Sequence, residues 1–267
     1  ALELDPDNVD ARAALLLLEP FYRNWAVIER GCRDILSGNP GHSITRYNLA
    51  HVLTETGRWR EAIPFLQELA KREPFWALAR MQLFRALVNA GRLEEAEQEI
   101  QQSLRLWPRR LGIWSTRIRH LLVTGRPDEA MDFLEDKASQ PPDGAAFVEL
   151  DRAIVNAYRS GSPELRRDAV RRLLEDARAG PHEVVLAAVD CSMLGETDFA
   201  FSLLDGYYFG RGPWAGGKAQ RPATAFLFNS QSAQLRRDPR FETLVAQTGL
   251  ERFWRTTGTQ PDYRRFA

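Results

Sequence analysis

The chain has 267 residues, 44% of them hydrophobic, and carries 36 basic and 36 acidic side chains, so its formal net charge is zero. A neutral chain has no overall field that would draw it to nucleic acid or to a membrane, and neither is expected as a direct partner. Cys32 and Cys191, the two cysteines, lie far apart without metal-ligand spacing, which argues against a disulfide framework or a zinc site. We therefore expect a reducing, cytoplasmic location, and no apolar run reaches the roughly 20 residues of a membrane span.

The first residues, 1–8, read as the end of a helix that runs into Pro6. They are interpreted as a partial repeat, and they lead us to expect that the chain is a fragment of a longer protein.

Prolines recur with a period of 34 residues, at Pro6, Pro40, Pro74, Pro108 and Pro142. A fixed period of this length is typical of stacked helical hairpins, in which each unit buries its apolar face against the next. Four units follow from this period, a degenerate one at 9–42 and three regular ones at 43–76, 77–110 and 111–144.

Other residues keep the same register in the three regular units. Gly57, Gly91 and Gly125 recur where a first helix must end, and glycine adopts the left-handed conformation that ends a helix. Glu-Ala pairs follow at 61–62, 95–96 and 129–130, where an acidic residue favours the start of a second helix and a small one allows close packing. This pattern resembles the tetratricopeptide repeat family, which implies two antiparallel helices per unit.

The unit at 9–42 departs from that pattern. It carries Arg23, Ile28 and Cys32 where glycine, alanine and an aromatic residue would be expected. Arg117 likewise takes a core position that leucine usually holds in the family, and Pro64 lies several residues into a predicted second helix, where it costs a backbone hydrogen bond.

Beyond residue 144 the period slips. Two further helix pairs are predicted, at 145–159 with 163–178 and at 182–194 with 197–208, followed by a Gly/Pro loop at 210–224 and a short helix that Gly249 ends. The residues up to 267 are expected to cap the array. The predicted organisation is thus a repeat array at 1–142, degenerate hairpins at 143–209, and a loop with a C-terminal cap at 210–267.

The C-terminal stretch 235–254 resembles the end of bacterial repeat proteins whose hairpins follow a winged-helix or nucleotide-cyclase domain. That resemblance implies an alternative role for the chain, as a ligand-sensing or dimerising regulatory domain of a bacterial transcription or signalling protein whose effector domain is absent here.

In such hairpins the first helix lines the concave face, and positions 5, 6, 9 and 13 of each unit point toward a partner. The candidate partner-binding residues at these positions are Tyr47, Asn48, His51, Met81, Gln82, Arg85, Asn89, Ser115 and Arg119. Arginine binds carboxylates bidentately, so an acidic peptide segment is the sharpest ligand hypothesis. The alternative is that these groups only solvate an unused surface or pair with internal acids such as Glu55.

Catalytic and cofactor signals are weak. The stretch 212–218 matches the spacing of a phosphate-binding loop but lacks the preceding strand and the hydroxyl after Lys218. None of the four histidines stands at metal-ligand spacing, and the arginines between 166 and 172 are diluted by neighbouring acids. We expect no catalytic residue, metal or cofactor.

The sequence therefore predicts an all-α, right-handed superhelical solenoid of antiparallel helical hairpins with a C-terminal cap, which binds a protein or peptide without catalysis. Homodimerisation stays open, as does occupation of the concave groove by the chain's own loop at 210–224, with Trp214 as an internal mimic of a ligand.

Overall fold

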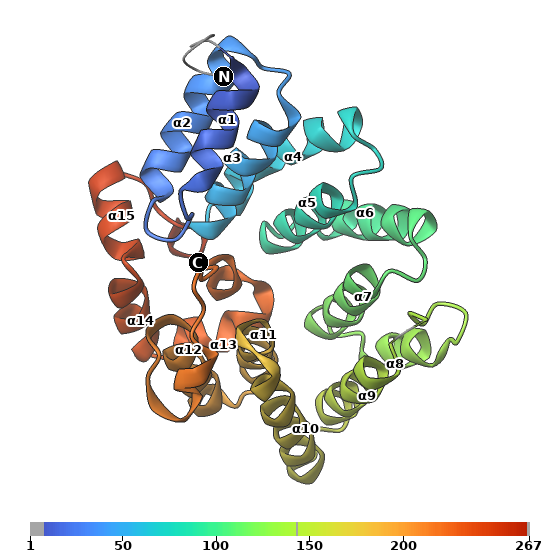
Figure 1. Ribbon diagram of the computed structural model, residues 1–267. Helices are drawn as coiled ribbons and strands as arrows, with labels where there is room; N and C mark the ends of the chain where they lie inside the picture. The colour runs from blue at the N-terminus through green and yellow to red at the C-terminus, as the bar shows by residue number, and fades with distance from the viewer. Residues whose placement is uncertain (1–7, 143, 266–267) are drawn as a thin grey trace. The chain divides into compact units, whose positions relative to one another are not determined.

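A computed structural model describes residues 8–142 and 144–265 of the chain, and all regular structure within them is helical (Figure 1). The segment 1–7, with Pro6 and the predicted partial repeat, lies outside the described residues. Many successive helices pack against one another. The helices up to residue 209 are α1 Val9–Leu18, α2 Trp25–Gly38, α3 Ser43–Glu55, α4 Trp59–Arg72, α5 Ala77–Asn89, α6 Leu93–Leu106, α7 Leu111–Val123, α8 Pro127–Glu135, α9 Ala145–Ser160, α10 Pro163–Asp176, α11 Pro181–Met193 and α12 Thr197–Phe209.

The predicted period is present in the helix boundaries. Helices α3, α5 and α7 begin at residues 43, 77 and 111, the first positions of the three regular units, and α4, α6 and α8 begin at 59, 93 and 127. Gly57, Gly91 and Gly125 adopt left-handed φ angles of 77°, 77° and 73° in the turns between them. In each turn the residue after the glycine donates its N–H to the carbonyl five residues earlier, which satisfies a carbonyl at the helix end.

The degenerate first unit has a positive φ at the glycine position without glycine, but its turn differs, because the Asn24 N–H bonds the Phe21 carbonyl three residues earlier. Arg23 stands at the glycine position and has a φ of 68°, the one positive φ of a non-glycine residue in the described chain. Its guanidinium donates to the carbonyls of Gln247 at 2.8 Å and Thr248 at 3.2 Å. Those carbonyls lie in the last turn of α14 (Arg240–Thr248), where a cation is favourable. Ile28 and Cys32, the other departures, are fully buried.

The described chain divides into two compact units that are not successive along the sequence. The N-terminal unit comprises residues up to Glu99, Ala223–Phe228 and residues from Glu242 onward, and the second unit comprises Ile100–Pro222 and Asn229–Phe241. The sequence-based division placed 210–267 in one C-terminal segment, whereas this segment contributes to both units.

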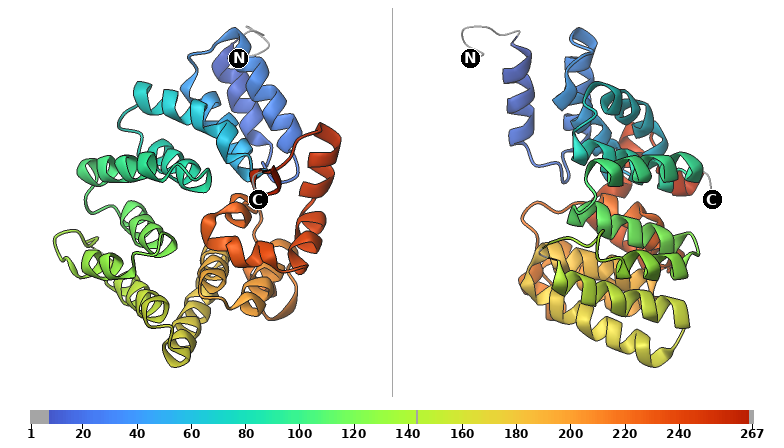
Figure 2. Two further views of the ribbon diagram at one scale, coloured as in Figure 1. Left: turned by 180° about the vertical axis from the view of Figure 1, so that it is seen from behind. Right: turned by 90° about the vertical axis from the view of Figure 1, so that its right-hand side faces the viewer.

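Within the N-terminal unit, the C-terminal residues cover the turn that follows α3. The indole Nε1 of Trp254, in α15 (Leu250–Thr257), donates to the Thr56 carbonyl at 3.0 Å. Asp262, in α16 (Asp262–Arg265), donates its N–H to the Gly57 carbonyl at 2.9 Å, and its carboxylate accepts the Arg60 N–H at 2.8 Å. Figure 2 shows α15 beside α2, in agreement with their direct contact. The predicted cap thus lies on an early hairpin.

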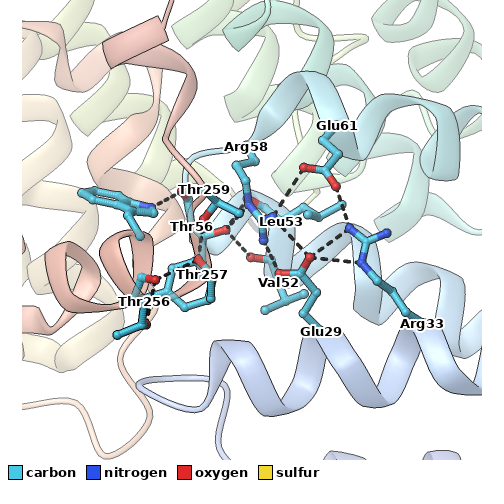
Figure 3. Close-up of polar contacts among 12 residues, drawn as sticks. Glu29, Arg33, Val52, Leu53, Thr56, Arg58, Glu61, Thr256, Thr257 and Thr259 are labelled. Carbon is cyan, nitrogen blue, oxygen red and sulfur yellow. Dashed lines mark hydrogen bonds and ion pairs between the residues drawn. The ribbon is translucent and has the colours of Figure 1, made fainter.

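A cluster of ion pairs fixes α2 against the start of α4 (Figure 3). The Arg58 guanidinium, with only 4% of its side chain exposed, bonds both carboxylate oxygens of Glu29 and lies 3.4 Å from Glu61. Arg33 bonds Glu29 at 2.9 Å and Glu61 at 2.6 Å. The Arg58 guanidinium also lies 5.6 Å from the ring of Phe253 in α15. This cluster is internally compensated and is best explained as structural.

In the second unit, α7 to α12 bury a continuous apolar core in which Trp114 is fully inaccessible. Arg117 is 6% exposed, as its core position predicted. The loop after α12 contains a 3-10 segment, η2 (Gly212–Gly217), that packs on α12. None of the helices in the described residues is long and apolar enough to cross a membrane.

Candidate functional site

The predicted binding residues of the N-terminal unit lie on α3 and α5, which contact each other directly. Tyr47, His51 and Arg85 are half-buried, as are Met81 and Asn89. The amides at position 6, Asn48 and Gln82, are more deeply buried, at 8% and 7% exposed. The two helices therefore bring the predicted groups together, although the amides face the interior more than an open groove requires.

Aromatic rings form one wall of this site. The Tyr47 ring stacks on Trp76, with centroids 4.9 Å apart, and lies parallel to His51 at 6.2 Å. Phe21 meets His51 edge-on at 5.0 Å. Burial raises the pKa of Tyr47 to about 12, while nearby Arg85 lowers it and Glu55 raises it. The Tyr47 hydroxyl therefore stays protonated at neutral pH and remains a hydrogen-bond donor.

His51 connects the two helices. The Gln82 Nε2 atom lies 3.3 Å from His51 Nδ1. Because an amide nitrogen only donates, this contact is a hydrogen bond in the tautomer whose Nδ1 carries no proton. Nε2 is 3.8 Å from Glu55 Oε1, too long for a hydrogen bond, and Glu55 Oε1 is buried without a hydrogen-bond partner.

The other oxygen of Glu55 is held by the chain's own C-terminal part. Thr224 donates its backbone N–H to Glu55 Oε2, and its hydroxyl lies 2.7 Å from the same oxygen. Thr224 and the Glu55 carboxylate are both inaccessible to solvent. Glu55 occupies position 13 of its unit, one of the positions predicted to point toward a partner. At this position Thr224 of the same chain is bound instead.

Arg85 is the arginine of this site. It makes no hydrogen bond or ion pair with any residue that the structure describes, although burial lowers its pKa and Tyr47 is the neighbour that opposes the effect. A desolvated cation without a partner is energetically costly, and an anion that binds beside it recovers that cost.

Arg119, the corresponding residue of the next unit, is already paired. Within the second unit its guanidinium bonds Asp190 through Nη2 at 2.8 Å and through Nε at 3.3 Å, and it bonds Asp151 through Nη1. Nη1 also lies 3.2 Å from Ser115 Oγ. Both carboxylates are about 95% buried and come from α9 and α11, outside the 34-residue units. For Arg119, this arrangement matches the alternative interpretation, in which the candidate binding residues pair with acids of the same chain.

The loop at 210–224 is divided between two environments. Trp214 packs on α12 so closely that a Cβ atom added to Gly206 would lie 2.4 Å from the Trp214 Cβ. Trp214 is half-buried and packs on α12 within the second unit, whereas Thr224 contacts Glu55 within the N-terminal unit. The phosphate-loop spacing at 212–218 follows α12 rather than a strand, so its required context is absent from the described residues.

No group of three or more His, Cys, Asp or Glu side chains in the described chain is placed to hold a metal ion. Sequence reasoning did not predict the Glu55–Thr224 contact or the Arg119–Asp151–Asp190 triad. The one sequence signal for the first contact was that Glu55 lies four residues after His51 and eight after Tyr47, on the same face of the helix.

No known protein family matches the chain. Part of it is 30% identical over 174 residues to siroheme synthase 2 of Yersinia pestis (strain Pestoides F) and to siroheme synthase 1 of Yersinia pseudotuberculosis serotype I (strain IP32953). Each match covers 61% of this chain and 34% of the relative. The chain therefore spans about a third of the length of these curated relatives, and the likeness does not assign it to their family.

Proposed function

We propose that the chain is a non-catalytic, tetratricopeptide-like module that binds a protein or peptide segment on the face formed by α3 and α5. The 34-residue repetition of helix boundaries and the recurrent left-handed glycines support the repeat type. The observation that carries the binding site is Arg85, a half-buried guanidinium with no partner in the described chain. It favours a ligand with a carboxylate, which takes two parallel hydrogen bonds from arginine.

The neighbouring groups complete a site for an extended acidic segment. The protonated Tyr47 hydroxyl supplies a second donor, and the rings of Tyr47 and Trp76 supply apolar contact area. Arg119 is left out of this proposal because Asp151 and Asp190 already neutralise it. The proposed site therefore contains fewer residues than the set predicted from the sequence, and it lies within the N-terminal unit.

A peptide array compared with the same array in which Asp and Glu are replaced by Asn and Gln tests this function. Acidic peptides should bind, their amide counterparts should bind about tenfold more weakly, and Arg85→Gln should remove the difference. Arg30→Gln is the matched control, because Arg30 is an exposed arginine of the same unit without a partner in the described chain. Equal binding of acidic peptides by the Arg85→Gln and wild-type proteins would contradict the proposed site.

The partial likeness to siroheme synthases favours one second candidate, a contribution to siroheme synthesis. Formation of siroheme by the purified chain would support this candidate. If the chain forms no siroheme in an assay in which a control siroheme synthase is active, this candidate is excluded. The regulatory-domain alternative stays a prediction from the C-terminal sequence.

A further inference from the structure

The second unit carries a surface hollow of about 340 Å³ between α10 and α12. Its apolar lining comes from Val170 and Leu174 on α10 and from Phe199 on α12. Phe199 is 41% exposed, so an aromatic ring lies open to solvent beside the aliphatic side chains. A hollow of this volume is within the size range of small-ligand sites, and an exposed aromatic surface gains free energy when an apolar group covers it.

The rim of the hollow is positively charged. Arg171 is neutralised by its ion pairs with Glu175 at 2.8 Å and with a second acid on the same helix. Arg167 and Arg178 also line the hollow, and neither makes a hydrogen bond or ion pair with any described residue. Glu196 is the opposing carboxylate at this rim. Two uncommitted guanidinium groups face one carboxylate, so the remaining charge favours an anion.

Arg178 borders a second hollow as well. This neighbouring space, of about 290 Å³, is lined by Arg178 together with Trp214, Gly216 and Gly217 of the η2 loop. No atom lies within 4 Å of the position where a Cβ of Gly216 would stand, so the loop backbone there is open. One guanidinium thus stands between an apolar hollow and an open loop with an indole ring. A ligand whose charged head group binds Arg178 can therefore place its apolar part in the first hollow, beside Leu174.

We propose that the groove formed by α10, α12 and the η2 loop binds a small anionic amphiphile, an aromatic or medium-chain carboxylate or sulfonate. Its apolar body lies against Leu174 and Phe199, and its head group bonds Arg178 and Arg167. This site is separate from the proposed peptide site on α3 and α5 and does not depend on it. The charge complementarity explains why two arginines without partners flank an apolar surface.

The full 267-residue chain tests this site with 8-anilinonaphthalene-1-sulfonate as a fluorescent probe and decanoate as its competitor. The wild-type protein should enhance the fluorescence of the probe, and decanoate should displace it. Arg178→Gln and Phe199→Ala should each weaken decanoate about fivefold to tenfold. Arg166→Gln, on the same helix but outside the hollow, and Phe75→Ala, an exposed ring of the N-terminal unit, are the matched controls. Circular dichroism establishes that each variant is folded.

Three results would overturn the proposal. If decanol displaces the probe as well as decanoate does, the surface is apolar without selectivity for anions. If inorganic phosphate alone displaces the probe at the same concentration, the apolar hollow contributes nothing to binding. Equal decanoate affinities for Arg178→Gln, Phe199→Ala and both controls would place the probe elsewhere on the protein.

Discussion

The buried Arg119–Asp151–Asp190 triad makes the stability of the second unit depend on pH in a direction opposite to that of an ordinary ion pair. Arg119 holds Asp190 with two nitrogens but Asp151 with one, and Asp151 Oδ2 is buried without a hydrogen-bond partner. Asp151 is thus the less stabilised of the two carboxylates. Its burial raises its pKa from 3.8 to about 6, an effect that the nearby Arg119 opposes and the charge of Asp190 reinforces.

The sign follows from proton binding. Between about pH 4 and pH 6 the folded protein keeps a proton on Asp151 that the unfolded chain has lost, so this group stabilises the fold below pH 4 and the stabilisation is lost as the pH rises through 6. A difference of about two pH units between the folded and unfolded pKa corresponds to about 3 kcal/mol. Asp151→Asn stays neutral over the whole range and should lack this loss.

Urea-induced unfolding followed by far-ultraviolet circular dichroism at several pH values from about 4 to about 7 measures the effect. The free energy of unfolding of Asp151→Asn, relative to that of the wild type, should rise by about 2 kcal/mol over this range. Asp132→Asn, which changes an exposed carboxylate of the same unit, is the control and should show no comparable rise. A constant difference between Asp151→Asn and wild type, or one that falls as the pH rises, would refute the reasoning.

Three further predictions concern the N-terminal unit, and urea unfolding measures each. Arg23→Gly and Arg23→Ala both lose the bonds to α14, but only glycine adopts the left-handed φ without strain. The free energy of unfolding of Arg23→Gly should therefore be about 1 kcal/mol higher than that of Arg23→Ala, and equal values would contradict this. Thr224→Val removes a hydroxyl donor from buried Glu55 and should cost about 2 kcal/mol, whereas an unchanged midpoint would exclude an energetic role for this contact. Arg58→Met should cost about 2 kcal/mol because Glu29 then keeps only its ion pair with Arg33, and adding Glu29→Gln should recover part of that loss; additive losses would rule out coupling.

The helical architecture was predictable because it follows from local signals that repeat. A glycine that ends a helix acts through its own φ angle, so its position alone predicted the turns at 57, 91 and 125. The case of Arg23 marks the limit of that reasoning. Its side chain does not favour a positive φ, yet Arg23 adopts one while its guanidinium bonds α14, and the neighbouring Ile28 and Cys32 are fully buried.

The location of the C-terminal residues was not predictable from the same signals. Trp254 and Asp262 donate to carbonyls of the turn after α3 across about 200 positions of sequence, and such carbonyls are present in every sequence. Such contacts leave no periodic pattern. Gly57 shows their consequence, because a Cβ at this position would lie 2.8 Å from Pro261 in addition to its strained φ. The same glycine thus ends a helix and admits the C-terminal segment.

The candidate site was predictable in its positions but not in its chemistry. His51, Arg85 and Arg119 occupy one position of three successive units, and their first helices have the same length and turn. Their side chains nevertheless have different surroundings. His51 lies between Gln82 and Glu55, Arg119 is neutralised by two buried acids, and Arg85 has no partner in the described chain. A regular backbone repeats the direction in which a side chain points, whereas the acids that neutralise Arg119 come from α9 and α11, outside the 34-residue period. Arg85 is the cation of this row that no described residue neutralises, and it is therefore the residue on which the proposed ligand would depend.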